Sequence, residues 1–301
     1  MELDLVRIEC ETVTDTPVQL ADTLYNALRN FEERFKAACC QDIRETCSSC
    51  SHLACPYRMV FDQRLSSDPE IVRLHQKPSL PFSLYISMLD NNMSSCTVGL
   101  VVVGTAINYI ALFYTSLVQM VETAVSAVLP RSTFAVHTYG LDSQDARYEV
   151  IPSESMVEGV TLISAQNILL NTVNSDTIRM NLKSPLRLLN NGSIAHEFDF
   201  GMFFRSQLRR CSSMCAYYGE GELDLDFTGL SDSAQNVAVL EDEIRYIQPP
   251  WSRRMNRAGL MGTVECTGLV EPMFSLLLLG SFFNAGKGAT FGSGYYQIEP
   301  L

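Results

Sequence analysis

The stretch EPMFSLLLLGSFFNAGKGATFGSGYYQIEPL, residues 271–301, contains three kinds of local sequence in a fixed order. After an opening Glu-Pro pair, the almost wholly apolar residues 273–283 predict a buried helix with proline in its first turn. Four glycines follow within residues 286–294, and Gly286 is the expected helix stop. Residues 295–298 are typical of a short strand. We therefore expect a helix, a glycine-rich loop and a strand, in that order.

The glycine-rich loop contains Gly286, Lys287, Gly288, Gly292 and Gly294. Glycine adopts positive φ and lets another backbone approach closely, and successive backbone N–H groups beside a lysine can bind an anion. A flexible surface loop is the alternative. The pattern is not a P-loop, because no Ser or Thr follows the lysine, and it is not a dinucleotide fingerprint, which opens a helix.

The segment LLLLGSFFNAGKGATFGSGYYQIE resembles the C-terminal glycine-rich signature of CRISPR-associated endoribonucleases of the RAMP superfamily, which process precursor CRISPR RNA. Other stretches fit the same family: CPYRMVF with PFSLYIS, SPLRLLNNG with FRSQLRRCSSMCAYYG, and WSRRMNRAGLMGTVE. The resemblance implies an α+β protein with two tandem ferredoxin-like (RRM-like) domains. It also implies that the glycine loop lies near the RNA backbone.

The first half of the chain shows the strand–helix–strand–strand–helix–strand order of the split βαβ pattern. A first strand is followed by a helix that carries Leu24, Leu28, Phe31 and Phe35 on one face. The segment PFSLYIS, a buried strand TVGLVVVG with an amphipathic helix up to residue 128, and TFAVHTY complete the pattern. We expect residues 1–145 to form the first domain, with a cysteine-rich insertion, the loop 39–55, after its first helix.

The second half repeats this order after a polar linker predicted at residues 140–158. Strands are expected at residues 161–170 and 177–188, and a helix at residues 196–218. A basic hairpin and the C-terminal helix, glycine loop and strand follow. We therefore expect residues 159–301 to form the second domain.

The composition is that of a globular protein with a sizeable core, with 47% hydrophobic and 19% charged residues. The net charge of −12 is unusual for a protein that binds RNA phosphates. Basic residues are nevertheless concentrated locally: residues 179–215 have six against two acidic ones, and residues 245–257 have four arginines and no acid. An acidic body with basic patches is compatible with RNA binding but does not by itself indicate it.

The start of the sequence, MELDLVRIEC, is charged and strand-like, so we expect no signal peptide. Residues 98–120 are uncharged, but Gly104 and Asn108 divide them into a strand and a helix, so we expect no membrane span. Ten cysteines without a secretory signal favour reduced thiols or metal ligands over disulfides. We therefore expect a cytoplasmic protein.

The cysteine-rich loop has the spacing of a zinc site. Cys47 and Cys50 form a C-x-x-C knuckle, and Cys40 and Cys55 complete a set of four thiolates. The resembled family often has a comparable cluster at this place. Packed or free thiols and an iron–sulfur cluster are the alternatives to structural zinc.

Five arginines and the single tryptophan are candidate RNA ligands. Arginine forks match phosphate geometry and an indole can stack on a base, whereas solvated surface charge is the alternative. The absence of acid around the second group favours RNA. The candidates are Arg209 and Arg210 on a predicted helix, and Arg253, Arg254 and Arg257 beside Trp251.

The resemblance also implies the reaction: metal-independent attack by the ribose 2′-OH, for which the protein supplies a base, an acid and positive charge. In the family the catalytic histidine tends to lie on or just after the first helix, with tyrosine and lysine nearby. That helix offers Tyr25 and Lys36 but no histidine. His52 is the nearest match and His196 the second candidate, and an arginine-assisted or inactive variant remains open.

These observations predict an endoribonuclease that binds CRISPR repeat RNA, cleaves precursor crRNA to 5′-OH and 2′,3′-cyclic phosphate ends, and stays on the crRNA in an effector complex with other CRISPR subunits. One alternative is a non-catalytic RAMP subunit that holds the repeat end of the guide RNA. A second alternative is a zinc-dependent scaffold without an RNA role.

Overall fold

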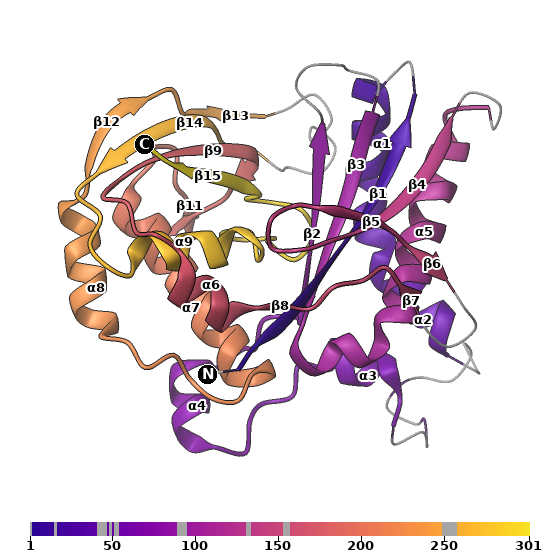
Figure 1. The fold of residues 1–301 in the computed structure, drawn as a ribbon, viewed down its shortest axis with the longest axis horizontal. Helices are drawn as coiled ribbons and strands as arrows, with labels where there is room; N and C mark the ends of the chain where they lie inside the picture. Colours follow the sequence, from indigo (N-terminus) through magenta and orange to yellow (C-terminus); the bar gives the residue numbers. More distant parts are fainter. Residues whose placement is uncertain are drawn as a thin grey trace. The chain divides into compact units, whose positions relative to one another are not determined.

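The computed structural model describes residues 2–14, 17–40, 47, 50, 54–88, 95–130, 134–152, 157–248 and 258–301 (Figure 1). The chain forms two compact units. The N-terminal unit consists of Leu5–Phe82 and Ser87–Leu162. The C-terminal unit consists of Met1–Asp4, Ser83–Ile86 and Ile163–Leu301.

The sheet of the N-terminal unit has the order β2-β3-β1-β4-β5. Strand β1 pairs antiparallel with β3 on one side and β4 on the other, with Arg7 opposite both Val101 and Leu141. The four strands of the βαββαβ pattern, β1 to β4, thus lie in the ferredoxin-like order, as the sequence predicts. The elements are β1 (Asp4–Val13), α1 (Pro17–Ala27), η1 (Leu28–Asn30), α2 (Phe31–Cys39), α3 (Pro56–Phe61), α4 (Pro69–Leu74), β2 (Phe82–Met88), β3 (Ser95–Val103), η2 (Gly104–Tyr109), α5 (Ile110–Ser126), β4 (Ala135–Leu141) and β5 (Arg147–Glu149).

Phenylalanines from both main helices form the centre of the N-terminal core. Phe31 and Phe35 on α2 and Phe113 on α5 are fully buried. The ring centroids of Phe35 and Phe113 lie 4.8 Å apart, and Phe82 at the start of β2 lies 5.3 Å from Phe31. The apolar face predicted for the first helix therefore packs as expected, although a 3₁₀ turn at residues 28–30 divides that helix into α1 and α2.

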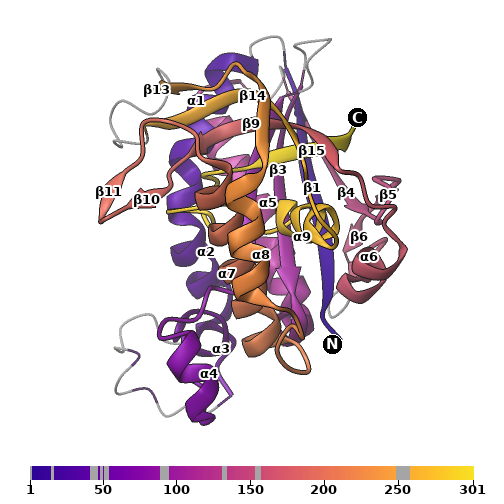
Figure 2. The same ribbon diagram turned by 90° about the vertical axis from the view of Figure 1, so that its left-hand side faces the viewer.

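The sheet of the C-terminal unit repeats the same order as β12-β14-β9-β15, with β13 paired to β14. Figure 2 shows helices α7 and α9 on one side of this sheet. The elements are β8 (Ile163–Ser164), α6 (Ala165–Asn171), β9 (Thr177–Leu186), β10 (Leu189–Asn190), β11 (Ser193–Ile194), α7 (Phe200–Tyr218), α8 (Phe227–Ser233), η4 (Ala234–Asn236), β12 (Ala238–Asp242), β13 (Arg245–Ile247), β14 (Gly259–Thr267), α9 (Met273–Ser281) and β15 (Tyr296–Pro300).

Three sequence predictions about local structure are wrong. Residues 161–170 are not a strand: only β8 is extended, and Ser164 caps α6 by accepting a hydrogen bond from the N–H of Asn167. Helix α7 begins at Phe200, because Asp199 accepts from the N–H of Met202 and so caps it there. The predicted linker contains the paired strands β6 (Ile151–Pro152) and β7 (Val157–Glu158), as well as β5.

The uncharged run of residues 98–120 is divided between β3, η2 and α5, as predicted. Within the described ranges, no helix is long and apolar enough to cross a bilayer.

Tyr296 on β15 joins the two helices of the C-terminal unit to the sheet. Its ring meets Phe203 of α7 edge to face, with centroids 5.2 Å apart. Its hydroxyl donates to the carbonyl oxygen of Leu277 on α9 over 2.6 Å. The buried aromatic and its satisfied hydroxyl therefore fix α9, and with it the start of the glycine loop.

The glycine loop connects α9 to β15 and contains four glycines in the left-handed region. Gly286, Gly288, Gly292 and Gly294 have φ values of 72°, 86°, 85° and 67°. A Cβ on Gly294 would lie 2.0 Å from the carbonyl oxygen of Ala285. The predicted need for glycine is therefore confirmed, since both the positive φ and the close backbone approach exclude a side chain.

Hydrogen bonds hold this loop against the end of β9. Ala285 N–H donates to the carbonyl of Gly294 over 2.9 Å, and Gly294 N–H donates to the carbonyl of Pro185 over 3.0 Å. The side-chain amide of Asn284 donates to the carbonyls of Leu84 and Ala289, over 2.8 Å each. These contacts are those of an ordered loop rather than a loose surface connection.

We expect Gly294→Ala to lower the free energy of unfolding by more than ~2 kcal/mol, because strain at positive φ and a backbone clash add together. The matched control is Gly192→Ala: Gly192 has a φ of 84° but nothing within 4 Å of its Cβ position, so only the strain remains. Urea unfolding of both variants measures the difference. Equal losses would show that the close approach to Ala285 is unimportant.

Candidate functional site

Several backbone N–H groups of the glycine loop are already engaged in hydrogen bonds within the C-terminal unit. The N–H groups of Ala285, Lys287, Phe291, Ser293 and Gly294 all donate to carbonyl oxygens of the C-terminal unit. An anion at the loop would therefore bind through the remaining N–H groups and side chains. Lys287 is exposed, whereas Gly292 and Gly294 are buried.

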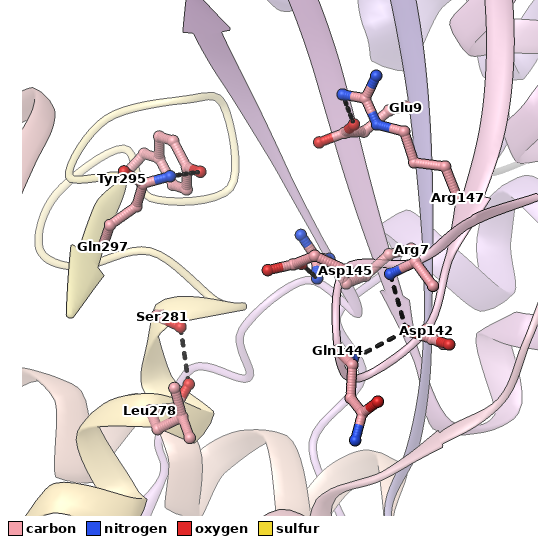
Figure 3. A network of polar contacts seen from close by, with 11 residues as sticks. Arg7, Glu9, Asp142, Gln144, Asp145, Arg147, Leu278, Ser281, Tyr295 and Gln297 are labelled. Carbon is pink, nitrogen blue, oxygen red and sulfur yellow. Dashed lines mark hydrogen bonds and ion pairs between the residues drawn. The ribbon is translucent and has the colours of Figure 1, made fainter. Parts of the chain in front are cut away.

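Several arginines outside the loop are already paired with carboxylates. Arg147 spans Glu9 and Glu11 on β1, at 2.9 and 3.1 Å. Figure 3 shows its pair with Glu9. In the C-terminal unit Arg179 of β9 spans Glu265 and Glu299, at 2.7 and 3.1 Å. These charges are compensated inside each sheet, so neither arginine is a strong candidate for a phosphate ligand.

The two candidate arginines of α7 differ in their surroundings. The Arg210 guanidinium donates from Nε to the carbonyl of Phe283 over 2.6 Å and from Nη2 to the hydroxyl of Ser83 over 3.0 Å. Burial lowers the pKa of Arg210 to about 10, so it stays protonated at neutral pH. Arg209 is exposed, and its Nε lies 3.4 Å from the carbonyl of Arg205. Arg210 therefore secures the end of α9, while Arg209 faces solvent.

His196 lies in the loop before α7 and stacks on Tyr246 of β13. The ring centroids are 4.0 Å apart with an angle of 13° between the planes, and both side chains are exposed. Sequence reasoning missed Tyr246, although its place just before the arginine-rich residues 249–257 was a usable signal. Stacked aromatics at a surface are suited to binding an unpaired base.

The first-helix candidates lie in different environments. Tyr25 on α1 is buried, with 4% of its surface exposed. Lys36 on α2 places its Nζ 5.4 Å from the ring centroid of Tyr57. The Tyr57 hydroxyl donates to Glu32 Oε1 over 2.7 Å, and burial together with this bond raises the pKa of Tyr57. Tyr25 is therefore shielded from solvent, whereas Lys36 is partly exposed.

The four cysteines proposed as metal ligands line a single cavity of about 20 Å³. Its other lining residues are Lys36, Tyr57 and Arg58. The structure thus places Cys40, Cys47, Cys50 and Cys55 around one cavity, and their role as metal ligands stays a prediction. Among the described side chains, however, no group of three or more potential ligands is arranged to hold a metal ion.

The remaining candidates lie outside the described residues: His52, Trp251, Arg253, Arg254 and Arg257. Their proposed roles stay predictions. In the sequence, β13 precedes Trp251 and the three arginines, and β14 follows them.

Two family models match the sequence. The model of the CRISPR-associated endoribonuclease Cas6 matches residues 180–296, which reach from β9 to β15, and one described as an N-terminal domain matches residues 3–161. No curated protein matches the sequence.

Solved structures of Cas6 share the fold. Thermus thermophilus Cas6 (TTHB231) has 11% sequence identity and a TM-score of 0.52, over 99% of both chains. A Cas6 (TTHB231) product complex has 12% identity and a TM-score of 0.51, over 98% of this chain and 99% of that one. This likeness supports the fold of two tandem ferredoxin-like domains that both strand orders display. From β9 to β15 the sequence is therefore similar to the Cas6 family of CRISPR-associated endoribonucleases.

Proposed function

We propose that this protein binds CRISPR repeat RNA and cleaves precursor crRNA. The observation that carries the proposal is the family match over residues 180–296, which include the whole glycine loop. Exposed Lys287 on the loop and the exposed pair of His196 and Tyr246 support an RNA-binding role for the C-terminal unit. One Cas6 of the same fold is described as a product complex.

The proposed reaction needs no metal ion. A general base takes the proton of a ribose 2′-OH, the 2′-oxygen forms a bond to the adjacent phosphorus, and the P–O5′ bond breaks. A general acid gives a proton to the leaving 5′-oxygen, and positive charge stabilises the pentacoordinate phosphorane. The products carry a 2′,3′-cyclic phosphate and a 5′-OH.

We assign the base to His52, with His196 as the second candidate. His52 falls in the segment that follows the first helix, where Lys36 is available to stabilise negative charge. Tyr25 is retained as a supporting residue of that helix, although its burial means that it would act through a neighbour or after a local rearrangement. Lys287 holds the RNA backbone, together with Arg209 and the arginines between β13 and β14.

Retention of the cleaved crRNA in an effector complex with other CRISPR subunits is part of the proposal. The alternative is a non-catalytic subunit that only holds the repeat end. The internal pairing of Arg147, Arg179 and Arg210 favours neither alternative, because it concerns stability rather than cleavage.

The experiment that separates these alternatives is single-turnover incubation of the purified protein with repeat RNA in EDTA. We expect one cut, a 5′-OH that polynucleotide kinase labels directly, and a 3′ end that acid converts from cyclic to linear phosphate. Binding without a cut would leave the non-catalytic subunit. A cut that appears only after Mg²⁺ is added would contradict the metal-independent mechanism.

His52→Ala should lower the single-turnover rate by roughly 10²–10⁴, with nearly unchanged RNA affinity, because it removes a general base but no phosphate contact. His196→Ala is the matched variant and should leave most of the rate. If His52→Ala cleaves fully and His196→Ala does not, the base is His196. Full cleavage by the double variant would remove histidine from the mechanism.

We also propose that the N-terminal unit holds one structural zinc ion through Cys40, Cys47, Cys50 and Cys55. The support is the ligand spacing and the common cavity of the four thiols. Thiolates are strong zinc ligands, and metal binding would then contribute to the folding free energy of this segment.

Cys50→Ser should therefore lose the zinc and lower the melting temperature, with elemental analysis and thermal unfolding as the measurements. The matched control is Cys39→Ser, one residue before the proposed set, which should keep the metal. The same measurements on His52→Ala show whether its rate loss comes from a damaged loop. Protein purified without chelators that contains no metal would refute the zinc site.

A further inference from the structure

Arg187 follows β9 directly and lies where three parts of the C-terminal unit meet. Its carbonyl oxygen accepts the hydrogen bond of Lys287 N–H over 2.9 Å, so the glycine loop is attached to its backbone. A Cβ on Gly286 would lie 2.6 Å from that same oxygen. A backbone hydrogen bond therefore holds Arg187 next to Lys287, so that the two side chains leave neighbouring backbone positions.

The side chain of Arg187 extends along the beginning of β14. Its Cγ lies 3.1 Å from the Cβ position of Gly259, the first residue of that strand. The residues just before β14 include Arg253, Arg254 and Arg257. Arg187 thus lies between the glycine loop and the beginning of β14.

Arg187 differs from Arg179 and Arg210 in the partners of its guanidinium group. Arg179, on the same strand, pairs with two glutamates, and Arg210 donates to a carbonyl and a hydroxyl. The Nε of Arg187 is buried and has no hydrogen-bond partner in the described part of the chain. No carboxylate among those residues forms an ion pair with it or with Lys287.

A buried donor without a partner is unfavourable, and an acceptor that reaches the guanidinium group on binding would remove that cost. We expect the acceptor to be anionic, because neither the guanidinium of Arg187 nor the ammonium of Lys287 forms an ion pair with a described carboxylate. A phosphate suits it best, since its oxygens match the planar fork of arginine and can accept from a lysine at the same time.

We propose that Arg187 binds a phosphate of the RNA backbone and shares that phosphate with Lys287. The proposal rests on the proposed function, because the phosphate belongs to the repeat RNA. It adds a ligand from the end of β9 to the glycine loop. It also gives the close packing of Gly286 on Arg187 a binding role besides its structural one.

The test is the salt dependence of RNA binding by Arg187→Met, which keeps the apolar stem beside Gly259 but removes the charge. The probe is repeat RNA with 2′-O-methyl riboses, which cannot be cleaved but retains every phosphate. We expect the dissociation constant to rise on the order of tenfold and the slope of log K against log salt to fall by about one. Arg187→Lys should keep most of the slope and lose affinity, because a lysine lacks the fork.

The matched control is Arg73→Met on α4, which removes one exposed positive charge outside this site and should leave the slope unchanged. The double variant Arg187→Met with Lys287→Met should lose less affinity than the two single losses combined, since both side chains bind one phosphate. Thermal unfolding of Arg187→Met should match that of the parent protein or exceed it, because an unpartnered buried donor is removed.

Two results would overturn this inference and leave the proposed function standing. One is a slope of log K against log salt in Arg187→Met that equals that of the parent protein. The other is weaker RNA binding accompanied by a lower melting temperature of the same variant. Strictly additive losses in the double variant would overturn the shared phosphate. If the parent protein does not bind the repeat RNA at all, both the proposed function and this inference are wrong.

Discussion

The approach of Gly294 to the carbonyl oxygen of Ala285 is the contact on which the C-terminal unit depends. It closes the loop that leaves α9, and it lets Gly294 N–H reach Pro185 beside the end of β9. Strand β15 then begins in register with β9, with Tyr296 opposite Leu182. The same closure brings Lys287 to Arg187. A single backbone contact therefore sets both the sheet and the placement of the cationic side chains.

The net charge of −12 takes on a different meaning once the ion pairs are known. Part of the acidic charge is neutralised by ion pairs with arginines within the two sheets. The carboxylates of these pairs are Glu9, Glu11, Glu265 and Glu299. RNA binding depends on the local potential at the contacting surface rather than on the total charge. A cation such as Lys287, which pairs with no carboxylate in the described part of the chain, therefore matters more for RNA binding than the net charge does.

Much of the fold could be predicted from the sequence, because its periodic apolar patterns are strong. The first helix face with Phe31 and Phe35, the strand at β3 and the apolar helix α9 all follow from local pattern. The segment around Ser164 could not be assigned in this way, since a short apolar run fits a strand and a helix equally well. There a side-chain cap decided the structure.

The candidate site was less predictable, because it depends on partners that are distant in sequence. Arg209 and Arg210 are adjacent in sequence, yet only Arg210 meets Ser83 and Phe283. Arg187 could not be distinguished from Arg179 by pattern, because the glutamates that neutralise Arg179 lie on other strands. The need for glycine in the loop was predictable, because it follows from backbone geometry alone.

Both sheets place their first strand in the interior, between partners that come much later in the chain. In the C-terminal unit β9 pairs with β14 and β15, which are much later in the sequence. The residues between Leu182 and its partner Tyr296 make up most of that unit. Contacts so distant in sequence make folding slow, because loop-closure entropy is lost before the pairing compensates for it. Until β15 docks, the edges of β9 can pair with another chain. Overproduction of this protein at high temperature should therefore be limited by aggregation during folding rather than by the stability of the folded state.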